Sequence, residues 1–172
     1  MLALSYKIEA HRWAVVQITD GERSLTLGPS LIFSDPLADL VSITIPFLKH
    51  LRDEYPLKLM CAREDEPGEY RWVLDKKGAD VGIRILRFEQ TYSHLTDQQG
   101  QEVFTSSAPI IKFANQVAVQ LRDLVQSLGM SGYETAMRRP FPLGTHQELT
   151  HLIRDERARI KQQRKDASKH GI

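Results

Sequence analysis

The sequence predicts one α+β domain. We expect about six to seven antiparallel strands, in one sheet or two, packed against two longer helices, with a short helix and a C-terminal basic helix. Short alternating segments separated by turn residues indicate the strands, and long segments with apolar residues at helical spacing indicate the helices. The length of 172 residues is that of a single domain, and 41% hydrophobic with 26% charged residues is an ordinary globular composition.

The N-terminal segments are predicted to be strands. Residues 2–10, 13–19 and 23–27 are rich in apolar and β-branched side chains. Asp20-Gly21 separates the second segment from the third and is a strong hairpin signal, because both residues tolerate positive φ. Gly28-Pro29 is expected to end the third strand.

A helix is predicted to follow, starting at Asp35-Pro36. The Asp35 side chain can cap the helix, and proline fits the first helical position, where no N–H is needed. Apolar or small residues then recur on one face: Leu37, Leu40, Val41, Thr44, Leu48 and Leu51. Pro46 conflicts with this pattern because a proline removes a helical hydrogen bond, so we expect a kink or break near Ile45.

Four further strands are predicted at residues 57–62, 70–74, 81–88 and 101–105. Turn residues at 76–78 and 97–100 separate them, so they are expected to pair antiparallel. Cys61 shares the apolar side of its strand with leucines, and its neighbours do not supply an electropositive setting. A buried core thiol is therefore expected rather than a nucleophile.

The C-terminal half is predicted to be helical. The longest apolar stripe spans residues 109–128, with Ser107 as its expected cap and Gly129 just past its end. Capping-box patterns at Ser131-x-x-Glu134 and Thr145-x-x-Glu148 predict a short helix that stops before Pro140 and then a last helix. The last ten or so residues are expected to fray, since they offer little to bury.

Composition argues against several classes of function. The net charge of +1 gives no global attraction for nucleic acid or anionic membrane. A single cysteine allows no internal disulfide, and neither a signal peptide nor a membrane span is recognisable. We therefore expect a cytoplasmic protein without a membrane partner, a metal or a cofactor.

The most distinctive segment is an acidic turn centred on Pro67-Gly68. We interpret Glu64, Asp65, Glu66, Glu69 and Tyr70 as a docking surface for a basic protein partner. The alternative is a solvated hairpin whose charges protect a strand edge from aggregation. Catalysis by these acids is disfavoured, because an exposed turn does little to shift a carboxyl pKa.

Two different kinds of function remain compatible with the sequence. An enzyme could assemble its site from scattered residues such as Arg87, Glu89 and His94. A nucleic-acid binder could use the basic helix from Arg154 to Lys165, although acids are interleaved and no aromatic residue is present for base stacking. A homodimer is also left open.

Arg138 and Arg139 precede a Pro-Phe-Pro segment that is expected to close the edge of the core.

Several ordered segments carry a family resemblance: Ser34-Asp35-Pro36-Leu37, Glu66-Pro67-Gly68-Glu69-Tyr70-x-Trp72, Leu128-Gly129-x-x-Gly132-Tyr133 and Pro140-Phe141-Pro142. The chain resembles a family of uncharacterised bacterial cytoplasmic proteins that are similar to immunity-type proteins encoded beside secreted polymorphic toxins. The resemblance covers roughly residues 30–145, and Met137 departs from it, where the pattern has a tryptophan. It implies a non-enzymatic inhibitor that neutralises a basic toxin domain by covering its active site.

Overall fold

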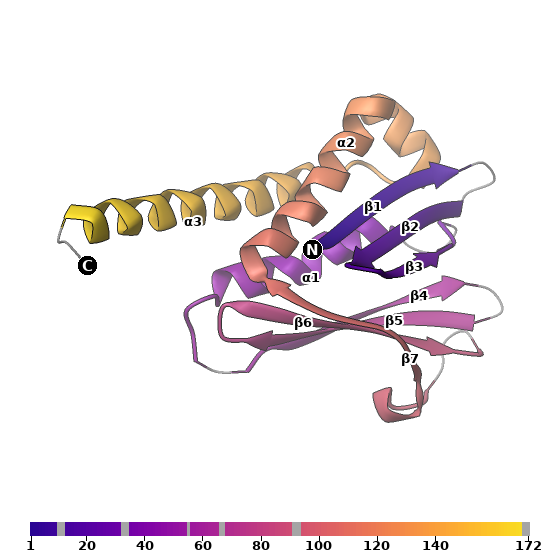
Figure 1. Ribbon diagram of the computed structural model, residues 1–172. Coiled ribbons are helices and arrows are strands. Elements are labelled where there is room, and N and C mark those ends of the chain that lie inside the picture. The colour runs from indigo at the N-terminus through magenta and orange to yellow at the C-terminus, as the bar shows by residue number, and fades with distance from the viewer. Residues whose placement is uncertain (10–12, 32–34, 55, 66–67, 91–93, 170–172) are drawn as a thin grey trace.

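The computed structural model describes residues 1–9, 13–31, 35–54, 56–65, 68–90 and 94–169, with the backbone alone for residues 62–65 and 169. Two antiparallel sheets and three helices make up this part of the chain (Figure 1). The predicted α+β class is confirmed, with its seven strands divided between a three-stranded and a four-stranded sheet.

The three-stranded sheet is an N-terminal meander in the order β1-β2-β3. It contains β1 (Leu2–Glu9), β2 (Trp13–Asp20) and β3 (Arg23–Leu27). Asp20 pairs with Arg23, and Gly21 adopts φ 61°, which confirms the predicted hairpin. At the β1 edge, the Tyr6 backbone N–H donates to Oε1 of Gln120 on the long second helix at 3.0 Å.

The four-stranded sheet is a second meander, in the order β4-β5-β6-β7. It contains β4 (Lys58–Asp65), β5 (Gly68–Lys77), β6 (Asp80–Phe88) and β7 (Gln101–Pro109). A register shift between Ile85 and Leu86 interrupts the pairing of β6 with β7. Within this sheet each strand pairs with its sequence neighbour, although residues 89–100 separate β6 from β7.

β7 runs further than predicted, and this overturns one expected helix cap. A 3-10 turn at Asp97–Gln99 precedes the strand, which continues to Pro109. Ser107 pairs with Gly82 inside the sheet, so the prediction that Ser107 caps the next helix is wrong. Pairing with β6 competes with the local capping pattern and prevails over it.

Helix α1 (Pro36–Lys49) begins as predicted. The Asp35 carboxylate accepts a hydrogen bond from the Ala38 N–H at 3.0 Å, and Pro36 occupies the first turn. Of the kink or break predicted near Ile45, the break is wrong, because α1 continues through Pro46 to Lys49, and the kink stays a prediction. Proline removes a single hydrogen bond there, and the carbonyl that loses its donor belongs to the exposed Ser42.

Helix α2 (Ile110–Met137) consists of two helical segments joined at Gly129, which has φ 69° and ψ 171°. The predicted end of the long helix at Gly129 is thus confirmed as a break, and the segment after it ends before Pro140 as expected. Helix α3 (Leu143–Lys169) already includes Thr145 in its first turn, so the prediction that Thr145 caps it is wrong.

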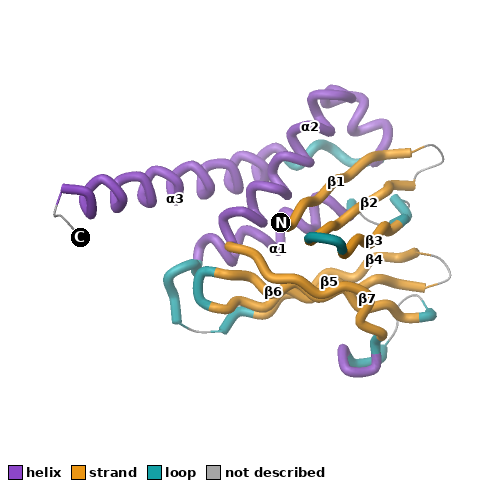
Figure 2. The backbone as a smooth tube through the Cα atoms, viewed as in Figure 1, coloured by secondary structure: helices purple, strands orange, loops and turns teal. Residues whose placement is uncertain are grey.

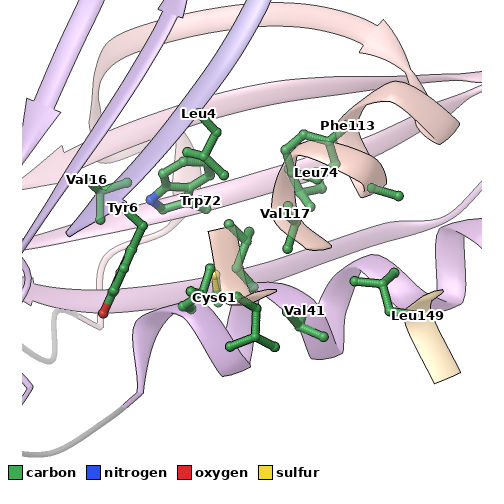
Figure 3. Packing of buried hydrophobic residues seen from close by; sticks show 14 of the residues in the cluster. Leu4, Tyr6, Val16, Val41, Cys61, Trp72, Leu74, Phe113, Val117 and Leu149 are labelled. Carbon is green, nitrogen blue, oxygen red and sulfur yellow. The ribbon is translucent and has the colours of Figure 1, made fainter. Parts of the chain in front are cut away.

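One hydrophobic cluster connects both sheets with all three helices. Figure 3 shows Leu4 of β1, Trp72 of β5, Phe113 of α2 and Leu149 of α3 contributing to it. Cys61 is buried in this cluster, which confirms the expected core thiol. Each fully buried large apolar side chain contributes about 1.5–3 kcal/mol, so this cluster is the main source of stability.

Helix α3 is anchored at its start and projects from the body at its end (Figures 1 and 2). Leu149 and Ile153 are buried, whereas residues 161–168 are all exposed. The helix extends through Lys169, and the fraying expected for the last ten or so residues stays a prediction. The projecting half therefore has little packing of its own.

Candidate functional site

The predicted acidic surface lies at the β4–β5 hairpin. Glu64 pairs with Glu69 across the two strands, and Asp65 pairs with Gly68. The side chains of Glu64 and Asp65 are not described, and Glu66 lies outside the described residues. For these three acids, the docking surface stays a prediction.

Neither Glu69 nor Tyr70 is fully exposed to solvent. Glu69 is only 4% exposed, and its Oε1 lies 2.7 Å from the Arg71 guanidinium. The expectation that Glu69 contributes to an exposed acidic surface is therefore wrong. Tyr70 is half-buried and packs against the core cluster. Arg71 follows Glu69 by two residues and so lies on the same face of the strand, and this spacing in the sequence indicates that the two side chains pair.

Arg71 connects the sheet to the segment that precedes β7. Its guanidinium donates to the Leu95 carbonyl at 2.9 Å and to Asp97 at 3.2 Å, and it stacks 4.1 Å from the centroid of the Phe88 ring. A hydrogen bond from Lys58, supported by Arg71, lowers the pKa of Asp97. The charged groups of this network are therefore partners in a structural contact.

The residues proposed for a scattered enzyme site are surface groups. Arg87, Glu89 and His94 are all exposed. Within the described residues, no group of three or more His, Cys, Asp or Glu side chains is arranged to hold a metal ion.

A groove of about 1020 Å³ lies between α2, α3 and the start of β1. We call it the basic groove, because five cations line it: Lys112, Arg157, Lys161, Arg164 and Lys165. No carboxylate stands among the described residues that line it. The apolar side chains of Met1, Leu2, Ile111 and Ile160 also contribute to its surface.

The spacing of residues along α3 creates this charge pattern. Arg157, Lys161, Arg164 and Lys165 stand at positions i, i+4, i+7 and i+8, which share one face of a helix, and so they line the groove together. The acids of the same segment lie off the groove: Asp155 contacts His151 at 3.0 Å, and Asp166 accepts a hydrogen bond from Gln162. The acids and cations that are interleaved in the sequence therefore lie on separate faces of the helix.

Buried Glu156 fixes the position of α3. Its carboxylate contacts Arg52, just beyond the end of α1, at 2.5 Å and Arg159 of α3 at 2.5 Å. The hydrogen bond from Arg159 is the largest cause of a lowered Glu156 pKa, and Arg52 adds to it. On the groove side, Arg157 donates to the Asn115 side chain of α2 at 2.7 Å. These contacts hold the part of α3 around residues 156–159 in place, where the α3 wall of the groove begins.

The Pro-Phe-Pro segment joins α2 to α3 and closes the core edge, as predicted. Phe141 is buried and makes an edge-to-face contact with Tyr133 at 5.2 Å between ring centroids. Arg138 adopts a left-handed conformation at the end of α2, with φ 51°.

The sequence marks the basic end of α3 as a candidate, but it does not indicate that Lys112 lies opposite, because 45 residues or more separate Lys112 from the α3 cations.

No helix within the described part of the chain is long and apolar enough to cross a membrane. Comparisons of the chain with protein-family models, curated proteins and solved structures found no significant match.

Proposed function

We propose that this protein is a non-enzymatic protein-binding module and that the basic groove is its main binding surface. The observation that carries the proposal is the gathering of five cations from two helices around a groove whose described lining contains no carboxylate. Such a surface complements an acidic partner, which it would attract by electrostatic steering and hold by the area buried in the groove.

The placement of the other charged groups supports binding rather than catalysis. Buried Asp35, Glu69, Arg71 and Glu156 each have a structural partner. General acids and bases are typically titratable groups with perturbed pKa values in a cleft, whereas the cations of the basic groove are exposed. The groove is thus better suited to hold a ligand than to transfer a proton.

An immunity-like role is the form of this proposal that the sequence resemblance favours. The bound chain would cover the active site of a toxin, and inhibition would follow from steric occlusion. Two surfaces of opposite charge could take part: the basic groove, and the β4–β5 hairpin with Glu64 and Asp65. A toxin with neighbouring acidic and basic patches would contact both.

Affinity capture from the native organism, with quantitative mass spectrometry, tests the proposal. Three forms of the full chain serve as baits: the natural sequence, Lys161→Glu with Arg164→Glu, and Glu64→Lys with Asp65→Lys. We expect a specific partner with the natural chain and at least tenfold less of it with the groove variant. Loss confined to the hairpin variant would move the binding surface to the acidic turn, and no specific partner for the natural chain would contradict the proposal.

A nucleic-acid binder is the second candidate, favoured by the same five cations. Lysine and arginine side chains along a groove can neutralise phosphates, and such binding weakens steeply as salt rises. None of the described lining residues is aromatic, so the groove offers no platform for base stacking. A mobility shift of labelled DNA or RNA that is lost in the Lys161→Glu, Arg164→Glu variant would support this candidate.

A further inference from the structure

We infer that the basic groove receives an acidic amphipathic helix from the partner protein. The apolar stripe of that helix would lie on Ile111 and Ile160, and its carboxylates would face the surrounding cations. This inference rests on the proposed protein-binding function and names the chemistry of the ligand.

The apolar part of the groove points to a peptide. Leu2 of β1, Ile111 of α2 and Ile160 of α3 line the groove and are only half-buried. Covering their remaining apolar surface is favourable for a leucine-rich helix face, at about 25 cal/mol for each Å² removed from water. A sugar–phosphate backbone would gain little from this surface, and no aromatic side chain is present to hold its bases.

The charge of the groove is balanced by no carboxylate that the structure describes. In the described part of the chain, no ion pair connects Lys112, Arg157, Lys161, Arg164 or Lys165 to a carboxylate. Their mutual repulsion is relieved when carboxylates enter between them, and the gain increases as water leaves the groove. Lys112 on α2 faces the cations of α3, so acids on both flanks of a bound helix would find partners.

The dimensions of the groove fit about three helical turns. Arg157 to Ser168 covers twelve residues of α3, and the eleven rises of about 1.5 Å between them make about 16 Å. Half of a helix of that length and about 10 Å in diameter occupies roughly 600 Å³. The groove volume of about 1020 Å³ therefore accommodates the inward half of such a helix with its side chains.

Fluorescence anisotropy with a synthetic probe tests the inference on the full chain. The probe is a labelled peptide of about 18 residues, with leucines on one helical face and glutamates on its flanks. A second peptide has the same composition but a scrambled order without an apolar face. Labelled single-stranded and duplex DNA of about 20 nucleotides complete the set.

We expect the amphipathic probe to bind at least tenfold more tightly than the scrambled peptide. Lys161→Glu with Arg164→Glu should weaken probe binding at least tenfold. Ile160→Ser should weaken probe binding at least threefold and leave any DNA binding unchanged, because it removes apolar surface and no charge. Lys7→Glu with Arg154→Glu is the matched control: it changes the net charge equally at exposed residues outside the groove lining, and affinity should stay within about twofold. Circular dichroism checks that each variant is folded.

Equal affinity for the two peptides would overturn the inference. So would DNA binding that exceeds probe binding and is lost with Lys161→Glu and Arg164→Glu, because the groove would then be a phosphate site. The capture experiment separates the two proposals. A native partner that still binds the Lys161→Glu, Arg164→Glu variant would exclude the groove as the binding surface but would keep the protein-binding function. A natural chain that captures no partner removes the function, whatever the probe shows.

Discussion

The contact between Tyr133 and Asp35 gives the sharpest test of the architecture. The Tyr133 hydroxyl donates to Oδ2 of Asp35, whose Oδ1 accepts from the Ala38 N–H at the start of α1. Tyr133 is 0% exposed and Asp35 is 5% exposed. Burial, together with the nearby Asp35 carboxylate, raises the pKa of Tyr133, so the hydroxyl stays a donor. Tyr133→Phe removes this donor and keeps the ring.

The cost can be worked from this geometry. A hydrogen bond to a charged group contributes about 1.5–3 kcal/mol, and solvent cannot replace the lost donor at a buried carboxylate. The edge-to-face contact with Phe141 and the cap on Ala38 are retained. We therefore expect about 2 kcal/mol of destabilisation, which for a chain of this length lowers Tm by about 4–8 °C.

Urea unfolding of the natural chain, Tyr133→Phe, Asp35→Asn and the double variant measures this coupling. The amide of Asp35→Asn can still cap α1, so the double-mutant cycle isolates the contact with Tyr133. We expect a coupling energy of about 1 kcal/mol or more, with unchanged m-values. A loss below about 0.5 kcal/mol for Tyr133→Phe would refute the assigned role of the hydroxyl.

Three further outcomes follow from the structure. Gly129→Ala should lower the free energy of unfolding by urea by about 1–3 kcal/mol, because φ 69° with ψ 171° is strained for alanine, although nothing lies within 4 Å of the added Cβ. Its control is Gly144→Ala, in a helix with open space around the added Cβ, which should be neutral or stabilising. Because the pKa of Glu156 is lowered in the folded chain, its ionised form stabilises the fold fully above the ordinary pKa of 4.5, and this stability is lost as pH falls through the lowered pKa. Glu156→Gln should therefore reduce the decrease in Tm at acidic pH. Backbone amides of residues 161–168 should exchange with deuterium much faster than those near Ile153, and equal protection would contradict an unsupported helix end.

Much of the fold follows from local patterns. The hairpin at Gly21, the cap at Asp35 and the end of the long helix at Gly129 depend on residues whose backbone preferences act within a few positions. The errors occur where distant contacts compete with such patterns. Ser107 pairs with β6 instead of capping α2, and α1 continues through Pro46 because its buried residues, such as Phe47 and Leu48, pack in the core.

The candidate site is less accessible to sequence reasoning. The basic end of α3 and the helical spacing of its cations are visible in the sequence, but which element the cationic face meets depends on the docking of α3, to which the contacts of Glu156 contribute. Lys112 reaches the groove through the packing of α2 beside α3, and the burial of Glu69 depends on Arg71 and on the segment before β7. Local patterns therefore identify charged residues, while tertiary packing decides which of them meet.

The strand order has a consequence for how the chain reaches this structure. Within each sheet, every strand pairs with its neighbour in the sequence, and the longest connection is the one from Phe88 to Gln101, so both meanders can form from contacts that are local in the sequence. The slower events should be the docking of the finished meanders and the arrival of α2 at the β1 edge, where Gln120 meets the Tyr6 backbone across more than a hundred residues. During synthesis, the edge of β1 therefore waits for a helix that emerges much later from the ribosome.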